Sequence, residues 1–323
     1  WTLEHAFNKN VYYPIPKQVA RKFFEINNDE FIIMNLNRNQ PRKRWDHCIM
    51  AFIKFISKHL GEKIKLMVLT SVNGAWDLTE LMTNEANKYN INFEQLKKHF
   101  IFIQNPQKLS DKDINIMYNV ADIGWNTCDG EGFGLCNFEQ AGIGIPQVIP
   151  HIGGFLDFFN ENNSIPIKPK YSIYSDTSKD AVGGELEMCD INDYVDALEK
   201  YYTNRDLILK HGAQSRKDII ENYTWSEKAR HFRTIILEAT KDLFPEKEDS
   251  IDVMSEINSL INTTDDDLDN IDIDKLIENK IASNNQLQLK ITEEKLVKQS
   301  DLDKLSKDDL KTLQEKIHKL LNA

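Results

Sequence analysis

The sequence predicts an α/β fold, with a Rossmann-like parallel sheet and helices on both of its faces. Three observations support this prediction. Short apolar segments alternate with segments of helical spacing along the first two thirds of the chain. The connections between them are short, and a glycine-rich turn separates one predicted strand from the next helix. Ligands bind such sheets beyond the carboxyl ends of the strands, so we look for site residues there.

The elements follow from apolar periodicity and from turn and cap residues. Strands are predicted over 31–36, 65–70, 100–103, 122–127 and 146–149. Helices are predicted over 43–60, 77–89 and 135–143. Another begins at Ser110 as N-cap, with Asp113 three positions on. Two more lie within 191–222, and a last one begins at Thr224. Residues 160–182 contain Pro166 and Pro169 and are predicted to form a long loop.

A composition change near Pro245 divides the chain. We expect residues 1–244 to form one Rossmann-like domain. Residues 245–323 carry 19 Asp and Glu against 11 Lys, so most of the net charge of −11 lies there. This segment has no aromatic residues, and we predict an acidic tail that is mainly helical or disordered. Residues 306–321 have an amphipathic helical pattern, so the tail could dock a partner.

Composition excludes several classes of protein. No apolar stretch is long enough for a transmembrane segment. Lys and Arg form no extended cluster, which argues against a nucleic-acid partner. The four cysteines have neither zinc-site nor disulfide spacing, and Asp265 to Asp267 lie in the polar tail, so no metal site is predicted. We expect a soluble, cytoplasmic protein.

The glycine-rich turn is the most informative segment. Gly130, Gly132 and Gly134 stand between a predicted strand and a helix, with Glu131 among them and Glu139 eight positions after it. Glycines allow the backbone to approach a ligand, and the free amides at a helix start favour an anion such as a diphosphate. Glu139 could accept hydrogen bonds from a ribose, and Glu131 from the hydroxyls of a sugar. Glycines in such turns are also common for steric reasons alone.

A second group is the basic turn at 37–44, between the first predicted strand and its helix. Arg38 and Lys43 lie five positions apart across this turn. Arg offers a planar fork and Lys a compact charge, and together they suit a diphosphate whose negative charge grows as a sugar departs. Cations at a helix start oppose the helix dipole, which favours a ligand over a merely solvated turn.

Several motifs in the same order resemble the retaining GT-B glycosyltransferases of family 4, or group 1 transferases. The matching segments are Arg38 to Lys43 as R-x4-K, Met117 to Asp122 as L-Y-x-x-A-D, Glu131 to Glu139 as E-x7-E, Gly144 to Pro146 as G-x-P, and Tyr223 to Trp225 as Y-T-W. The resemblance extends from about His5 to Phe244. The chain departs from the pattern at Asp129-Gly130, where a Ser is common, and at Gln140, where a Glu is usual.

The resemblance implies the C-terminal, donor-binding half of a GT-B enzyme, without the acceptor-binding half. It implies Glu131, Arg38 and Lys43 as the catalytic residues. Donor binding would fall to Arg38, Lys43, Gly132, Phe133, Gly134, Leu135 and Glu139, with Gln104 and Asn105 as candidates for the nucleoside. The implied reaction transfers a sugar from a nucleoside diphosphate sugar with retention, and it needs no cofactor or metal. The acceptor, whether glycan, lipid or protein, stays open.

Other functions are weighed against this one. The chain could be a nucleotide-sugar-binding module that has no transferase activity on its own, because the acceptor half is absent. NAD binding is disfavoured because Leu135 stands where the dinucleotide fingerprint needs its third glycine. A scaffold role is disfavoured by the short heptad pattern of the tail. An epimerase would need further acid and base residues, and no matched set is found.

Overall fold

Both faces of the central sheet are buried. In the computed structural model, which describes residues 2–104, 108–174 and 184–240, consecutive side chains of each strand point to opposite faces. On β1, Phe31 and Ile33 join one hydrophobic cluster, while Ile32 and Met34 join another. A sheet that is apolar on both sides requires helices on both sides.

The sheet has six parallel strands in the order β3-β2-β1-β4-β5-β6. This confirms the predicted Rossmann-like α/β fold. The strands are β1 (Phe31–Leu36), β2 (Ile64–Leu69), β3 (Phe100–Ile103), β4 (Ile123–Trp125), β5 (Gln147–Pro150) and β6 (Ser164–Ile167). All five strands predicted from the sequence are present. Two have the predicted ends, and the ends of the other three differ by one or two residues.

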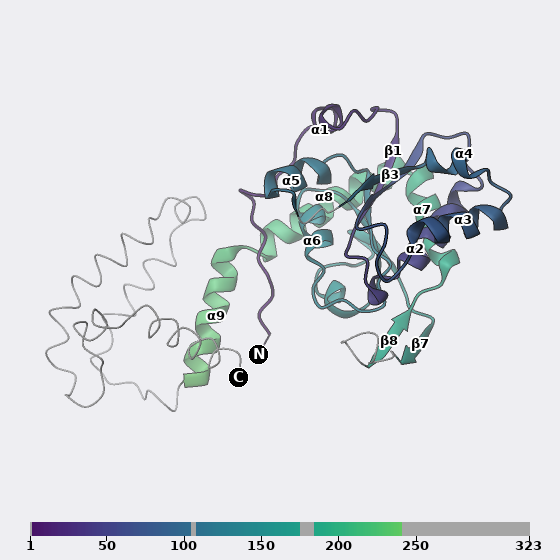
Figure 1. Cartoon of the computed structure of the whole chain (residues 1–323). Coiled ribbons are helices and arrows are strands. Elements are labelled where there is room, and N and C mark those ends of the chain that lie inside the picture. Colours follow the sequence, from purple (N-terminus) through teal and green to yellow (C-terminus); the bar gives the residue numbers. More distant parts are fainter. Residues whose placement is uncertain (1, 105–107, 175–183, 241–323) are drawn as a thin grey trace, which may run out of the picture. The chain divides into compact units, whose positions relative to one another are not determined.

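The helices divide between the two faces (Figure 1). Helices α2 (Trp45–Ile56), α3 (Leu78–Lys88), α4 (Phe93–Lys97) and α7 (Ile191–Thr203) supply buried residues to the first cluster. Helices α1 (Lys17–Phe23), α5 (Asp111–Tyr118) and α6 (Leu135–Gly142) supply the second. Helix α8 (Arg205–Asn222) contributes to both, and α9 (Trp225–Thr240) follows it.

Local sequence signals set several helix boundaries as predicted. The Ser110 side chain accepts from the amide of Asp113, and the Asp113 carboxylate accepts from the amide of Ser110. Asp77 caps α3 through the amide of Glu80. The helix predicted over 43–60 begins later, at Trp45, because a short 3₁₀ turn (Pro41–Lys43) precedes it. That turn belongs to the candidate site described below.

The prediction of a long loop over 160–182 is wrong in part. It contains strand β6 and strand β7 (Tyr171–Tyr174), which pairs antiparallel with β8 (Glu185–Met188). Pro166 suggested a loop because proline cannot donate to a sheet ladder. It is tolerated here because β6 is the edge strand, beyond which no further strand pairs in the described sheet. Residues 175–182 of the predicted loop lie outside the described residues.

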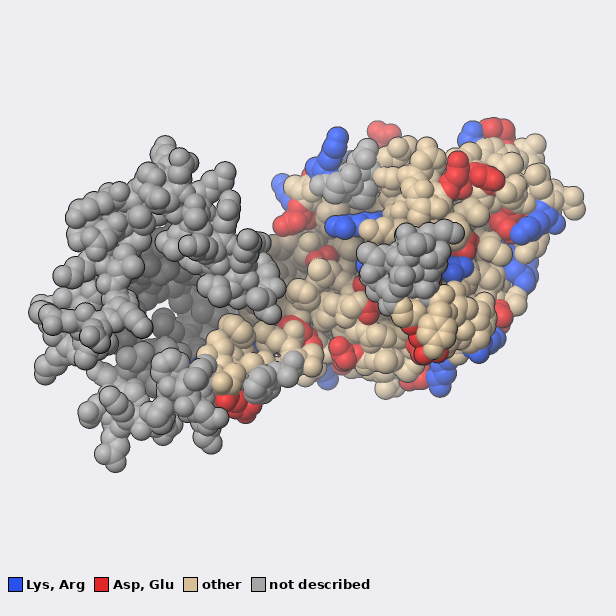
Figure 2. Space-filling view, turned by 60° about the horizontal axis from the view of Figure 1, so that its bottom comes forward, with Lys and Arg blue, Asp and Glu red and all other residues tan. Residues whose placement is uncertain are grey.

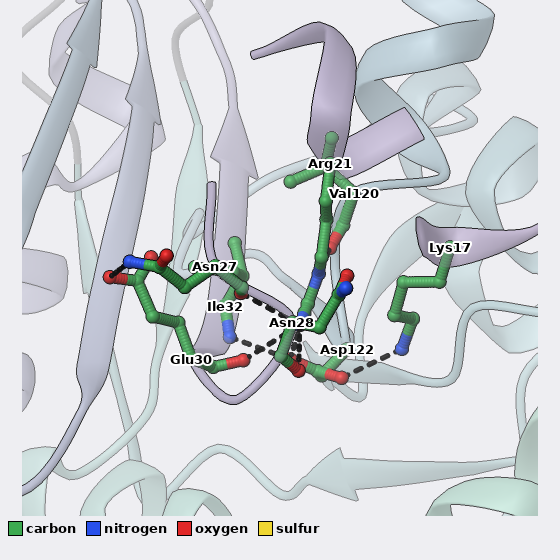
Figure 3. Close-up of polar contacts among 8 residues, drawn as sticks. All are labelled: Lys17, Arg21, Asn27, Asn28, Glu30, Ile32, Val120 and Asp122. Atoms are coloured by element: carbon green, nitrogen blue, oxygen red, sulfur yellow. Dashed lines mark hydrogen bonds and ion pairs between the residues drawn. The ribbon is translucent and has the colours of Figure 1, made fainter. Parts of the chain in front are cut away.

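At the amino ends of the strands, helix α1 is fastened by a buried arginine (Figure 3). Arg21 donates to the carbonyls of Val120, Asn28 and Glu30, and its guanidinium lies 2.7 Å from a carboxylate oxygen of Asp122. That same oxygen accepts from the amide of Ile32. A charge so deeply buried needs this complete set of partners. This end of the sheet is therefore a structural joint, and the opposite end is where a ligand is sought.

Within the described part of the chain, no helix combines the length and apolarity needed to cross a bilayer. On the face drawn in Figure 2, Lys and Arg are interspersed with Asp and Glu. The predicted acidic tail over 245–323 lies outside the described residues.

Candidate functional site

A cavity of about 720 Å³ lies at the carboxyl ends of β1 and β2. Residues that follow each strand form one side of it, and the start of α6 forms another. Its walls are formed by His5, Leu36, Asn37, Arg38, Asn39, Gln40, Arg42, Lys43, Thr70, Ser71, Ile114, Glu131, Phe133, Gly134, Leu135, Cys136 and Asn137. Six of the residues predicted from the sequence are thus brought together, namely Arg38, Lys43, Glu131, Phe133, Gly134 and Leu135.

The basic turn is held against the segment that precedes the glycine-rich turn. The amide of Asp129 donates to the Arg42 carbonyl at 3.0 Å, and the Arg42 guanidinium donates to the Gly130 carbonyl at 3.0 Å. The Thr127 hydroxyl donates to the Arg44 carbonyl at 3.1 Å. Main-chain and side-chain bonds therefore fix two segments that are distant in the sequence. Their relative position does not depend on a ligand.

The glycine-rich turn is packed tightly on its inner side. The amide of Gly154 donates to the Glu131 carbonyl at 3.1 Å. A Cβ added at Gly153 would lie 2.2 Å from that same carbonyl oxygen, so two backbones meet there without side chains between them. Gly134 has a φ of 88° and a Cβ added there would lie 2.2 Å from Phe155 Cε1. Packing and backbone conformation thus both require glycine at position 134.

Gly132 differs from these glycines. A Cβ added there meets no atom within 4 Å, and Gly132 is not among the glycines with positive φ. Neither packing nor backbone conformation in the described structure explains a glycine at this exposed position. Gly132 does not itself line the cavity, but its neighbours Glu131 and Phe133 do.

The first residues of helix α6 line the cavity. Gly134 is its N-cap, and the amides of Asn137 and Phe138 donate back to the Gly134 carbonyl. The amides of Leu135 and Cys136 come before these and have no hydrogen bond to any part of the chain that the structure describes. The cavity therefore has two amide donors at the positive end of a helix dipole.

A buried amide network holds α6 in place. Asn126 donates to the Asn137 side chain at 2.8 Å, and Asn137 donates to Gln147 at 2.8 Å. Gln147 donates in turn to the Ile145 carbonyl. Gln140, at which the chain departs from the family pattern, is buried and faces this network, 3.5 Å from Gln147.

The charges in the cavity form a cluster around Glu131. The Lys43 ammonium forms an ion pair with Glu131 Oε2, and Arg42 lies 3.7 Å from Oε1. The Lys43 and Glu131 side chains are only 9% and 10% exposed. Arg38 is exposed on the cavity wall, and its guanidinium has no ion pair or hydrogen bond with the residues described.

Glu139 does not reach the cavity wall. Its carboxylate accepts a hydrogen bond from the Tyr118 hydroxyl at 2.7 Å, and Tyr12 also donates to it. Burial raises the pKa of Glu139 to about 7, although the two tyrosine hydroxyls act in the opposite direction. The carboxylate that was predicted to meet a ribose is thus engaged by tyrosines in this structure.

The predicted nucleoside residues are not part of this cavity. Gln104 follows β3 and lines a neighbouring cavity of about 600 Å³, to which Ser71 also contributes. Asn105 lies outside the described residues. Sequence reasoning missed Arg42 as a partner of Glu131, and it missed Thr70 and Ser71, which follow β2 at the same edge of the sheet.

His5 also forms part of the wall, although it was given no role from the sequence. Its ring packs edge-on against Phe133, with 4.9 Å between the ring centroids. The available signal was that the family resemblance begins at about this residue. No group of His, Cys, Asp and Glu among the described residues is arranged to hold a metal ion.

Comparisons with known proteins extend this description. No protein-family profile and no curated protein matches the sequence. Among solved structures, sucrose-phosphate synthase from Thermosynechococcus elongatus is similar with a TM-score of 0.56 and 16% identity, over 74% of this chain and 52% of that one. Anabaena HepE in complex with UDP-glucose is similar with a TM-score of 0.56 and 13% identity, over 73% of this chain and 57% of that one.

A third structure is matched over almost its full length. It is the C-terminal domain of a group 1 family glycosyl transferase from Francisella tularensis, with a TM-score of 0.53 and 17% identity, over 68% of this chain and 98% of that one. The chain spans about half of the length of the first two structures. These similarities show the fold, which is the Rossmann-like architecture found in GT-B glycosyltransferase structures.

Proposed function

We propose that the chain is the donor-binding half of a retaining, family 4 type glycosyltransferase, which transfers a sugar from a nucleoside diphosphate sugar to an acceptor. One observation carries the proposal. Lys43 and Glu131, which come from two motifs 88 residues apart, meet in a single cavity at the carboxyl ends of parallel strands. The same edge binds ligands in other open α/β sheets.

The diphosphate would lie between the basic turn and the start of α6. Arg38 and Lys43 supply two cations, and the amides of Leu135 and Cys136 supply donors at a helix N-terminus. The interaction of these groups with the diphosphate strengthens as the leaving diphosphate gains negative charge. An interaction that is stronger in the transition state than in the ground state lowers the barrier to transfer. We propose that they serve this purpose without a metal ion or a cofactor.

The sugar would lie beside Glu131 and the exposed side of the glycine-rich turn. The Glu131 carboxylate can accept hydrogen bonds from sugar hydroxyls. The open space over Gly132 supports this placement, since a ligand that approaches the backbone closely would explain the missing side chain.

We propose that the ribose binds at Glu139, as the family resemblance implies. The carboxylate already accepts from Tyr118 and Tyr12, so a ribose hydroxyl would take the place of one tyrosine hydroxyl. Gln104 and Asn105 remain candidates for the nucleoside. We also propose that the acceptor is a glycan, a lipid or a protein and that the protein is cytoplasmic.

A nucleotide-sugar-binding module without transfer is the second candidate. The observation in its favour is that residues of this chain alone form the walls of the cavity, so that binding needs no other domain. Turnover separates the two candidates. If the chain is an enzyme, we expect slow hydrolysis of the bound donor, in which water takes the sugar in place of the acceptor and free nucleoside diphosphate is formed. A pure binding module leaves the donor intact.

Calorimetric titration tests the proposal directly. The full chain is titrated with UDP, GDP and ADP and with their glucose or mannose derivatives. We expect one nucleotide series to bind, and Arg38→Ala to weaken that binding about tenfold or more because it removes a charge from the diphosphate site. Arg230→Ala serves as the control, since Arg230 is exposed on α9 and pairs with Glu227. Equal affinity in wild type and Arg38→Ala would contradict the assignment of Arg38.

A further inference from the structure

The cavity contains its own anion. Among the described residues of its walls, Arg38, Arg42 and Lys43 carry positive charge and Glu131 carries negative charge. Glu131 lies next to two of the three cations, with Lys43 at one carboxylate oxygen and Arg42 at 3.7 Å from the other. Any anion that binds to Lys43 must therefore share this ammonium with Glu131 or displace it.

The ion pair is fixed by its surroundings. Both side chains are about nine-tenths buried, and the Glu131 carbonyl is held by the Gly154 amide. Asp129 and Gly130, just before Glu131, are bonded to Arg42. The main chain on both sides of the ion pair is thus held in place, and the buried carboxylate lies directly beside these cations. Its charge therefore acts on whatever anion lies in the cavity, at short range and with little solvent screening.

We propose that Glu131 sets the preference of this site for a nucleotide sugar over the free nucleoside diphosphate. The inference rests on the proposed function and deepens it. Repulsion from the carboxylate weakens the binding of both ligands. Only the nucleotide sugar carries the transferred sugar, whose hydroxyls can donate to Glu131 in return. The free diphosphate carries one more negative charge once the sugar has left, so it is repelled more strongly.

The consequence is a site that releases its product. Arg38, Lys43 and the α6 amides together would hold a free nucleoside diphosphate tightly, because each is positive or a donor. Glu131 lowers the affinity for the free nucleoside diphosphate more than it lowers the affinity for the nucleotide sugar. Glu131 is thus a specificity residue, in addition to its contact with the sugar.

Glu131→Gln separates charge from shape. Glutamine keeps the size of the side chain and a carbonyl oxygen that can accept from Lys43 or Arg42, but it has no negative charge. The matched control is Glu30→Gln, which also removes one charge from a buried glutamate that pairs with a lysine, Lys65, at 2.9 Å. Glu30 precedes β1, at the end of the sheet opposite the cavity (Figure 3).

The experiment is calorimetric titration of the full chain and both variants. The probes are UDP, GDP and ADP with their glucose or mannose derivatives, and the series that wild type binds is used throughout. We expect Glu131→Gln to bind the free diphosphate about tenfold more tightly, equivalent to ~1.4 kcal/mol. Binding of the nucleotide sugar should not improve to the same extent, so the ratio of the two affinities falls. Glu30→Gln should match wild type for both ligands.

Two results would count against these ideas and are distinguishable. If wild type binds a nucleotide series but Glu131→Gln, still folded by circular dichroism, binds the free diphosphate no more tightly, this inference is overturned and the proposed function stands. If wild type binds none of the nucleotides, the proposed function is overturned, and the inference that rests on it is overturned with it. A Glu131→Asp variant adds a check, since it retains the charge and should keep diphosphate affinity near that of wild type.

Discussion

Glu139 shows how the environment of a single side chain changes its chemistry. The sequence predicted that Glu139 lies in a helix, but it did not predict which side chains contact the carboxylate. Tyr118 lies 21 residues earlier in the chain, and Tyr12 comes from the segment before α1. Periodicity places a residue on an element, whereas contacts between elements decide its burial. The raised pKa of Glu139 therefore could not be predicted from the sequence.

This pKa makes stability depend on pH in a defined direction. The folded chain holds a proton on Glu139 up to about pH 7, whereas an unfolded chain releases it near the ordinary value of 4.5. Ionising the buried carboxyl costs free energy, so its contribution to stability falls as pH rises from 4.5 to 7. We expect wild type to lose on the order of 1–3 kcal/mol relative to Glu139→Gln between pH 5 and pH 8.

Urea unfolding at several pH values measures this difference. Glu94→Gln on α4 is the control, because Glu94 is exposed and pairs with Lys97. Free energies of unfolding for wild type and Glu139→Gln that run parallel from pH 5 to pH 8 would show that Glu139 has an ordinary pKa in the folded chain.

At the scale of elements, the glycine-rich turn combines two requirements. Gly134 packs against Phe155, whereas Gly132 faces open space. On the other side of the turn, Gly153 and Gly154 pack against the backbone of residues 131–133. The two kinds of glycine cannot be told apart in the sequence, because the packing partners come from residues 153–155. The prediction that glycines lie between strand and helix was confirmed, but the structural requirement for Gly134 came only from the structure.

Alanine substitution should separate these requirements. We expect Gly134→Ala to lower the free energy of unfolding by about 1–4 kcal/mol, because the added Cβ meets Phe155 and the residue has a positive φ. Gly132→Ala should change stability by less than ~0.5 kcal/mol but weaken binding of the nucleotide sugar. Chemical denaturation and calorimetry provide the two measurements. A Gly132→Ala variant that binds as well as wild type would remove the argument that a ligand approaches this glycine.

Boundary signals explain which elements the sequence predicted well. The reciprocal bonds of Ser110 and Asp113 and the cap at Asp77 are local, so they can be recognised within a few residues. Strand β6 was missed because Pro166 is acceptable only at a sheet edge, and edge position depends on the strand order of the whole domain.

At the scale of the whole molecule, the described body has two hydrophobic clusters, one on each face of the sheet. The buried residues of both clusters all precede Tyr223 in the sequence. We therefore expect deletion of everything after Phe244 to shift the midpoint of thermal unfolding by less than ~2 °C, since the deleted segment is acidic and lacks aromatic residues. Differential scanning calorimetry of both chains checks this, and a drop of several degrees would mean that the tail stabilises the body.

The fold class, and the two turns that border the cavity, could be predicted from the sequence. Alternation of strands and helices indicated a parallel sheet, and carboxyl ends of parallel strands lie at one edge, so Arg38 and Glu131 were expected to converge. What the sequence could not supply was the ion pairing within the cavity. Arg42 and Lys43 are adjacent, and only the 3₁₀ turn at 41–43 and its bonds to residues 127–130 bring both side chains to Glu131.

The central claim is that the basic turn and the glycine-rich turn bind one diphosphate together. Amide NMR spectra of the ¹⁵N-labelled, deuterated full chain, recorded during titration with the nucleoside diphosphate that binds best, test it most directly. We predict that resonances of residues 37–43 and of residues 132–136 shift together and saturate with one dissociation constant. Saturable shifts that leave either segment unchanged would contradict the account.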